Sequence, residues 1–186
     1  EKALTTEKIV DDLLQLGKAS DPSKVSLEME TYDPREHVRQ IVDSFQRETH
    51  RHQFVLELPQ DAVEIVADRH RVGQVLDNLL INAVKYSPLG GEIKVSLERH
   101  GEDLQFCIAD QGVGLSETQL ERVFEKFYRV DHSDQATRGM GLGLSIAKDL
   151  VDAHGGRIWL ESIPRVGTKA YFTLPCAETE QNTPEN

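Results

Sequence analysis

One amphipathic stretch, residues 71–88, places the strongest constraint on the fold of this chain. It reads RVGQVLDNLLINAVKYSP. On a helix that turns by about 100° per residue, a broad apolar arc is formed by Val72, Leu76, Leu79, Leu80 and Ala83. Beside this arc, Asn78, Asn82 and Lys85 follow at i, i+4 and i+7 and form a polar row. We therefore predict a helix that buries one face and holds two amides and an ammonium along a single line.

The polar row has two interpretations. Amide oxygens are acceptable ligands for a hard cation such as Mg²⁺, and an ammonium pairs well with phosphate, so the row suits a metal-bound phosphate group. The alternative is a solvated helix face that happens to carry two asparagines. The row alone does not separate these interpretations.

The composition limits the classes of function. The 186 residues fit one domain of ordinary size, and 38% of them are hydrophobic. A net charge of −11 argues against a nucleic-acid groove, so a phosphate ligand must meet local bases or backbone N–H groups. No apolar run is long enough to span a bilayer or resembles a signal peptide, so we expect no membrane contact. Cys107 and Cys176 are expected to be ordinary thiols in a reducing cytoplasm.

Local patterns predict the order of helices and strands. Alternating apolar residues predict strands over 25–29, 54–58, 63–67, 92–99, 104–109, 157–162 and 168–174. We expect the second and third to pair, and the last four to form two hairpins. Helical periodicity predicts helices over Thr5–Lys18, after Asp33-Pro34-Arg35-Glu36, over 71–88, after Ser116, and over Gly141–His154. Asp33 with Glu36, and Ser116 with Gln119, are expected to form capping boxes.

These elements favour an α/β fold. Helices alternate with strands, but hairpins occur where a doubly wound fold would need crossovers. We therefore predict a two-layer sandwich, in which one mixed sheet carries three helices on one face.

Two glycine-bearing segments suit a flat base and a phosphate group. Asp110-Gln111-Gly112-Val113-Gly114 leaves a predicted strand, and its glycines let a ligand approach the backbone while Asp110 accepts a hydrogen bond from an exocyclic amine. The alternative for Asp110 is an Asx-turn at a strand end. Gly139-Met140-Gly141-Leu142-Gly143 opens a helix whose free N–H groups can bind phosphate. It matches neither a dinucleotide fingerprint nor a Walker loop.

A segment between these two glycine-bearing stretches has the features of a lid. Phe124–Arg129 leads into a polar run that ends at Arg138. Long polar segments next to a candidate site are typical of hinged lids, and Arg129 and Arg138 would then be cations near the phosphate. The alternative is a surface loop with two solvated charges.

Four motifs together resemble those of a known family. The chain contains, in this order, NLLINAVKYSP, DQGVGL, VFEKFYRVD and GMGLGLSIAKDLVDAHGG. They closely resemble the N, G1, F and G2 boxes of bacterial sensor histidine kinases, within the ATPase superfamily that includes gyrase, mismatch-repair ATPases and a heat-shock chaperone. The resemblance covers about residues 25–175 and implies a Bergerat-type ATP-binding fold with a mixed, mostly antiparallel sheet.

The resemblance also implies a division of the chain. Residues 1–20 look like the end of a dimerisation and phosphoacceptor helical domain, and residues 21–175 look like the catalytic ATP-binding domain. Residues 176–186 show no apolar pattern, so we expect a disordered tail.

By resemblance, one group of residues binds the phosphates of ATP. Asn82, helped by Asn78, would hold Mg²⁺, while Lys85 and Arg129 would contact phosphate. The backbone of the G2 box would cradle the phosphates, under a lid over about 130–140 that contains Arg138. The G2 residues concerned are Gly139, Gly141, Leu142 and Gly143.

A second group would bind the base. Tyr86 would lie against the adenine, and Asp110 would bind its amine, directly and through water. Thr168 would be a second partner of the base, and Gly112 and Gly114 would shape the pocket.

Two departures from the family pattern affect the expected chemistry. Gyrase-type members place a glutamate, the general base for water, where this chain has Asn78. An amide cannot take a proton, and Asp77 points about 100° away on the helix, so we expect slow hydrolysis of ATP by water. The family's acceptor motif is also missing, because none of the seven histidines has its context. We interpret His37, His50, His52, His70, His100, His132 and His154 as helix, loop or surface residues.

The resulting hypothesis is the catalytic domain of a protein-histidine kinase that uses ATP and Mg²⁺. It would transfer the γ-phosphoryl group to a histidine on a dimerisation domain of the same or a sister chain, for relay to a response regulator. We expect a cytoplasmic location, in a parent protein that could be membrane-anchored. The alternative function is a nucleotide-gated binding module without productive transfer.

Overall fold

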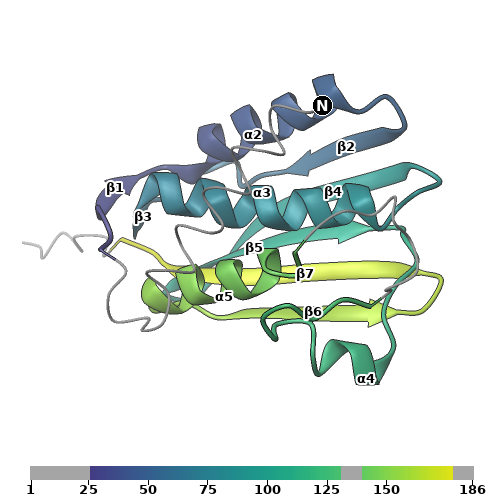
Figure 1. The fold of residues 1–186 in the computed structure, drawn as a ribbon. Helices are drawn as coiled ribbons and strands as arrows, with labels where there is room; N and C mark the ends of the chain where they lie inside the picture. Colours follow the sequence, from purple (N-terminus) through teal and green to yellow (C-terminus); the bar gives the residue numbers. More distant parts are fainter. Residues whose placement is uncertain (1–25, 131–139, 178–186) are drawn as a thin grey trace, which may run out of the picture.

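A five-stranded sheet forms one layer of the structure, and helices form the other (Figure 1). This computed structural model describes residues 26–130 and 140–177. The sheet has the order β2-β4-β5-β7-β6, with bounds His52–Glu57, Gly91–His100, Asp103–Asp110, Gly167–Pro175 and Ile158–Ile163. Only β2 and β4 are parallel, and the other neighbours are antiparallel. The predicted mixed, mostly antiparallel sheet is confirmed.

Three helices cover one face of this sheet, as predicted. They are α2 (Pro34–Glu48), α3 (Arg69–Lys85) and α5 (Gly143–Ala153), and α3 lies between the other two (Figure 1). Alternate residues of the central strands point into the core beneath them and are buried: Ile93, Val95, Leu97, Leu104, Phe106, Ile108, Phe172 and Leu174. This alternation explains why one face of the sheet packs on helices, while the other face carries polar side chains together with the stacked pair Trp159 and Tyr171.

The two predicted hairpins are confirmed, whereas the predicted pairing of the strands near residues 54–58 and 63–67 is wrong. The first of these, β2, pairs in parallel with β4. The second is β3 (Ile65–Ala67), which pairs with β1 (Glu30–Tyr32) in a separate two-stranded sheet. The strand expected over 25–29 therefore begins later, at Glu30, within the described residues. The closeness of β2 and β3 in the sequence suggested that they pair, but the two strands belong to different sheets.

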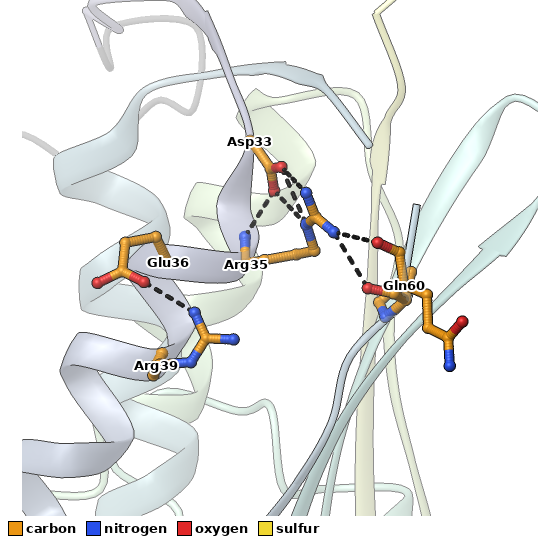
Figure 2. Close-up of polar contacts among 6 residues, drawn as sticks. Asp33, Arg35, Glu36, Arg39 and Gln60 are labelled. Carbon is orange, nitrogen blue, oxygen red and sulfur yellow. Dashed lines mark hydrogen bonds and ion pairs between the residues drawn. The ribbon is translucent and has the colours of Figure 1, made fainter. Parts of the chain in front are cut away.

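The loop between β2 and β3 is attached to the start of α2 (Figure 2). The Arg35 guanidinium donates to the carbonyl oxygens of Pro59 and Gln60, at 3.2 and 2.8 Å, and also to the Asp33 carboxylate. Asp33 caps α2 by accepting from the Arg35 N–H. These bonds hold the loop against the start of α2, where it connects β2 and β3 as members of two different sheets.

The two predicted capping boxes differ in outcome. At α4 (Glu117–Leu120) both halves form, since Ser116 accepts from Gln119 and the Gln119 side chain accepts from the Ser116 N–H. At α2 no box forms, because Asp33 accepts from the Arg35 N–H and Glu36 accepts from Gln40 and from Arg39, the latter seen in Figure 2. Nearby arginine and glutamine donors on the same exposed face compete for that carboxylate.

Several sequence expectations lie at or beyond the ends of the described residues. The helix over Thr5–Lys18 and the tail after residue 177 are outside them. The tail was expected to begin at Cys176, but Cys176 and Ala177 donate backbone hydrogen bonds to Glu102 and Glu64, so the ordered domain extends at least to Ala177. Among the described helices, none is both long and apolar enough to cross a membrane.

Asp68 fixes the start of α3 and attaches the incoming chain to it. Its buried carboxylate accepts from the backbone N–H of Arg71, at 3.0 Å, and of Glu28, at 2.9 Å. Burial raises the pKa of this carboxyl, but the two backbone bonds and the Arg71 charge outweigh it, and the pKa is lowered. The folded state therefore favours the ionised form of the Asp68 carboxyl.

We predict that Asp68→Asn lowers the free energy of unfolding by about 1–2 kcal/mol at pH 7, because one of two backbone donors loses its acceptor. A lowered folded pKa stabilises the protein above the unfolded pKa, about 4, and this stabilisation is lost as the pH falls through the folded pKa. The difference between variant and wild type should therefore narrow below about pH 4. Urea denaturation across pH measures this, and a difference that stays constant with pH would contradict it.

Candidate functional site

The polar row of α3 begins in the interior of the protein. Asn78 is only 5% exposed, while Asn82 and Lys85 are half-buried. A Cβ placed on Gly143, the first residue of α5, would lie 3.4 Å from the Asn78 Oδ1 atom. The Asn78 carboxamide therefore faces the start of α5. A solvated helix face, the alternative interpretation of this row, is contradicted at Asn78.

The row ends at the C-terminus of α3. Tyr86 follows the last helical residue, and its N–H donates to the Asn82 carbonyl at 2.9 Å. The Lys85 ammonium lies 4.9 Å from the centre of the Tyr86 ring, a cation–π contact. This contact holds an aromatic surface and a cation next to each other at the helix end.

Asp110 ends strand β5 and is held by two backbone donors. Its Oδ1 atom accepts from the Gly112 N–H at 2.8 Å and from the Thr168 N–H, on the adjacent β7, at 3.3 Å. Burial raises the pKa of this carboxyl, and the bonds from Gly112 and Thr168 oppose the increase. The Asx-type turn that was the alternative interpretation of Asp110 is thus present, and it also directs a partly desolvated acceptor into the same region as Tyr86.

Gly112 brings this strand end against the end of α3. A Cβ at Gly112 would lie 2.2 Å from the Tyr86 carbonyl oxygen and 2.8 Å from both Asp110 Oδ1 and Ser87 Oγ. The next residue, Val113, donates its N–H to the same Tyr86 carbonyl at 3.0 Å. We call Tyr86, Ser87, Asp110, Gly112 and Thr168 the Asp110 cluster. Only a residue without a side chain allows its members to meet.

Gly114 performs a similar role on the other side. It has a φ of 66°, and a Cβ there would lie 2.1 Å from the Ile163 carbonyl oxygen. The Thr168 hydroxyl, which was expected to bind the base, lies 2.9 Å from the Ser162 hydroxyl. The segment after β5 is therefore fixed against the β6–β7 hairpin.

The start of α5 is built from backbone. Its N-cap, Leu142, makes no side-chain capping bond, so the N–H groups of the first turn receive no acceptor from a capping side chain. The Leu142 side chain is buried in the core, and the residue can therefore offer a ligand only its backbone. We call Asn78, Gly141, Leu142 and Gly143 the α5 junction. Such a helix start favours anions.

The segment Phe124–Arg129, called here the phenylalanine-rich segment, is joined to the α5 junction. The Phe127 N–H donates to the Gly141 carbonyl at 3.0 Å, and a Cβ on Gly141 would lie 2.7 Å from the Tyr128 carbonyl oxygen. Phe127 has a φ of 67°, an uncommon conformation for a bulky residue. Arg129, half-buried, follows directly. Arg138 and Gly139, with most of the expected lid, lie outside the described residues.

Sequence reasoning missed Ser87, a member of the Asp110 cluster, and His52, which contacts Ser87. Ser87 is 2% exposed, and its position between Tyr86 and Pro88 reads in sequence as a helix stop. His52 is buried on β2, where its Nδ1 lies 2.8 Å from the Thr49 hydroxyl and its Nε2 lies 2.9 Å from the Ser87 carbonyl oxygen. The interpretation of His52 as a loop or surface residue is therefore wrong, and no local pattern marked it.

His154 lies at the end of α5, as expected from the helix predicted over Gly141–His154, and it is buried. Its Nε2 accepts from the Asp68 N–H at 3.0 Å, and its Nδ1 lies 2.7 Å from the Leu150 carbonyl oxygen. The bond to Leu150 requires a proton on Nδ1, which leaves Nε2 as the acceptor. His154 thereby joins the end of α5 to the start of α3.

Comparisons with known proteins agree with this geometry. The family described as "Histidine kinase-, DNA gyrase B-, and HSP90-like ATPase" matches residues 67–178. The sensor histidine kinase WalK of Bacillus subtilis (strain 168) is 38% identical over 179 residues, which cover 94% of this chain and 29% of that protein. The adaptive-response sensory kinase SasA of a Nostoc species is 38% identical over 176 residues, which cover 94% of this chain and 44% of that protein. The chain thus spans less than half the length of these relatives.

Solved structures show the same fold. Full-length ShkA in complex with AMPPNP superposes with a TM-score of 0.79 at 27% identity, over 92% of this chain and 36% of that one. Histidine kinase ThkA in complex with response regulator protein TrrA superposes with a TM-score of 0.75 at 27% identity, over 93% of this chain and 48% of that one. The similarity includes both the sheet and the helical layer.

We predict that Gly112→Ala weakens binding of ADP with Mg²⁺ by about tenfold to a hundredfold, because the new methyl group displaces Asp110 or Tyr86. Isothermal calorimetry measures the affinity. Gly101→Ala is the matched control, since a Cβ there meets nothing within 4 Å, although its φ of 64° makes it strained as well. Equal losses of affinity in the two variants would contradict the assigned role of Gly112.

Proposed function

The chain belongs to the histidine kinase-, DNA gyrase B- and HSP90-like ATPase family, and from this premise we propose how its residues bind and use ATP. It is the ATP-binding catalytic domain of a sensor histidine kinase. Because it spans only part of its relatives, the activity of the whole protein is also a proposal. That activity is transfer of the γ-phosphoryl group to a histidine on a dimerisation domain, for relay to a response regulator.

One observation carries the assignment of the site. The Asp110 cluster lies at the C-terminal end of α3, and the α5 junction faces the same helix at Asn78. Asn82 and Lys85 follow Asn78 toward the Asp110 cluster on the same side of the helix. A single helix therefore connects an acceptor suited to a base with a helix start suited to phosphates, which is the arrangement that a nucleotide requires.

At the base end, we assign adenine recognition to the Asp110 cluster. The Asp110 carboxylate accepts a hydrogen from the exocyclic amine, and Tyr86 lies against the ring. Thr168 supports the carboxylate through its backbone N–H. Gly112 and Gly114 keep the backbone close enough for a flat ligand.

At the phosphate end, local neutral and cationic donors have to bind the phosphates, because the chain as a whole is acidic and provides no attractive positive field. With a net charge of −11, the chain must bind phosphate through local groups. We assign these roles to Lys85, Arg129 and the backbone N–H groups of Gly141 to Gly143. From their sequence positions, Arg138 and Gly139 join them.

Magnesium fits the same end. The buried carboxamide of Asn78 and the half-buried one of Asn82 lie on one side of α3, and amide oxygens are suitable ligands for this hard cation. When bound, Mg²⁺ would neutralise charge on the transferring phosphoryl group. The chain's own residues would orient the phosphates and hold them until an acceptor arrives.

The proposed partners follow from this chemistry. The phosphoacceptor histidine lies on a dimerisation domain, to which we assign residues 1–20, with the catalytic domain starting at residue 21. The phosphoryl group then passes to a response regulator. We propose a cytoplasmic location, where ATP is available. Neither nucleic acid nor a membrane is a proposed partner of this domain.

The first experiment tests nucleotide binding. We predict that the wild-type chain binds ATP with Mg²⁺ in calorimetry, and that Asp110→Ala weakens this binding about a hundredfold, because the exocyclic amine loses a charged acceptor. Asp103→Ala, at the opposite and exposed end of the same strand, is the control and should bind as wild type does. Absence of heat with the wild-type chain, or unchanged affinity in Asp110→Ala, would overturn the assignment.

The second experiment tests transfer. With γ-labelled ATP alone, we expect hydrolysis on the order of 10⁻³ s⁻¹ or slower, because Asn78 cannot act as a general base. When the separate dimerisation domain of the similar WalK kinase is added, we expect acid-labile, alkali-stable label on that domain. The Asp110→Ala variant controls for contaminating enzymes. Tight ATP binding without any phosphohistidine would favour the nucleotide-gated binding module instead.

A further inference from the structure

The Ser87 hydroxyl is an anomaly at the Asp110 cluster. Among the described residues, its Oγ is the buried side-chain polar atom that has no hydrogen-bond partner. The residue is 2% exposed. An unpaired buried hydroxyl destabilises the folded state, and such costs are concentrated at functional sites. A polar group in this state therefore needs a physical explanation.

The position of this hydroxyl indicates its partner. A Cβ on Gly112 would be 2.8 Å from Ser87 Oγ and equally far from Asp110 Oδ1, so both oxygens border the same small space. The hydroxyl is near enough to the Asp110 carboxylate to lower its pKa as a hydrogen-bonding neighbour, but the contact falls outside the geometry of a fully formed hydrogen bond. A small movement of the chain at the cluster, with rotation of the hydroxyl, would complete the bond.

The backbone of Ser87 is held from the opposite side. His52 Nε2 lies 2.9 Å from the Ser87 carbonyl oxygen and must carry the proton in that contact. Arg51, the residue before His52, is also joined to the loop that follows Ser87, since its carbonyl oxygen accepts from the Gly91 N–H at 3.2 Å. These bonds hold the Ser87 backbone in place, and its buried hydroxyl borders the same small space as Asp110.

We propose that Ser87 is a positioning residue for base selection: when a nucleotide binds, its hydroxyl donates to Asp110 Oδ1, and the carboxylate presents Oδ2 to the exocyclic amine of a 6-aminopurine. The two backbone bonds to Asp110 use Oδ1, so Oδ2 is the oxygen assigned to the base. A 6-oxopurine places an acceptor there and is repelled by the carboxylate. This inference rests on the proposed function, because it requires an adenine nucleotide at the Asp110 cluster.

The test uses the whole chain with Mg²⁺ and two probes, ADP and inosine diphosphate, which carries an oxo group in place of the amine. We predict that Ser87→Ala lowers ADP affinity about tenfold, because the bond completed on binding is lost. Its inosine diphosphate affinity should stay within about twofold of wild type. The selectivity between the probes therefore falls about tenfold.

A second readout separates positioning from a structural role. Since Ser87→Ala removes an unpaired hydroxyl, the nucleotide-free variant should unfold at the same urea concentration as wild type or a higher one. Ser87→Thr keeps the hydroxyl and should restore most of the ADP affinity. Ser87→Cys, a weak donor of similar size, should give an intermediate loss and replaces the alanine variant if that variant does not fold.

Two results would overturn this inference. One is unchanged ADP affinity in Ser87→Ala, and the other is an equal loss for both probes. Failure of the proposed function is distinguishable from both, because the wild-type chain would then bind neither probe.

Discussion

The burial of one face of α3 is the constraint on which the rest of the structure depends. Leu76, Leu79 and Leu80 are at most 2% exposed, and they lie between the sheet and the two flanking helices. Since residues on a helix are separated by a fixed angle, burying this arc also decides where Asn78, Asn82 and Lys85 can lie. The polar row consequently runs from the start of α5 to the end of β5. Hydrophobic burial of α3 thus fixes the positions of the polar side chains on the same helix.

Polar groups in the interior of this domain, at the site and away from it, are stabilised mainly by backbone donors and acceptors. Asp110 accepts from two N–H groups, Asp68 accepts from two more, and His154 joins backbone groups of two helices. Buried polar groups require such partners, because desolvation without them is costly. Backbone partners also add no net charge, which suits an acidic chain that has to accommodate phosphates. Ser87 departs from this pattern, and it does so beside the acceptor assigned to the base.

Close approach of two pairs of chain segments is the second requirement of the site. Gly112 and Gly141 stand where any Cβ would overlap neighbouring backbone oxygens, at 2.2 and 2.7 Å. The first allows the end of β5 to meet the end of α3, and the second allows the phenylalanine-rich segment to meet the start of α5. Both glycines were identified in the sequence as ligand-binding residues. Their contacts show that they also permit the assembly of the site before any ligand is present.

The sequence by itself determined the elements whose signals are local: the amphipathic α3, the two hairpins, the Ser116 cap and the four ordered motifs. Helical periodicity and turn chemistry act over a few residues, so they can be recognised without the fold. Only the tertiary structure decided the parallel pairing of β2 with β4, the separate β1–β3 sheet, and the burial of His52, Ser87 and His154. The bond between His52 and Ser87 joins residues 35 positions apart in the chain, and the bond between Asp68 and His154 joins residues 86 positions apart. Such contacts depend on how the helices and strands pack, because no short-range pattern encodes which distant backbone group a buried side chain will meet.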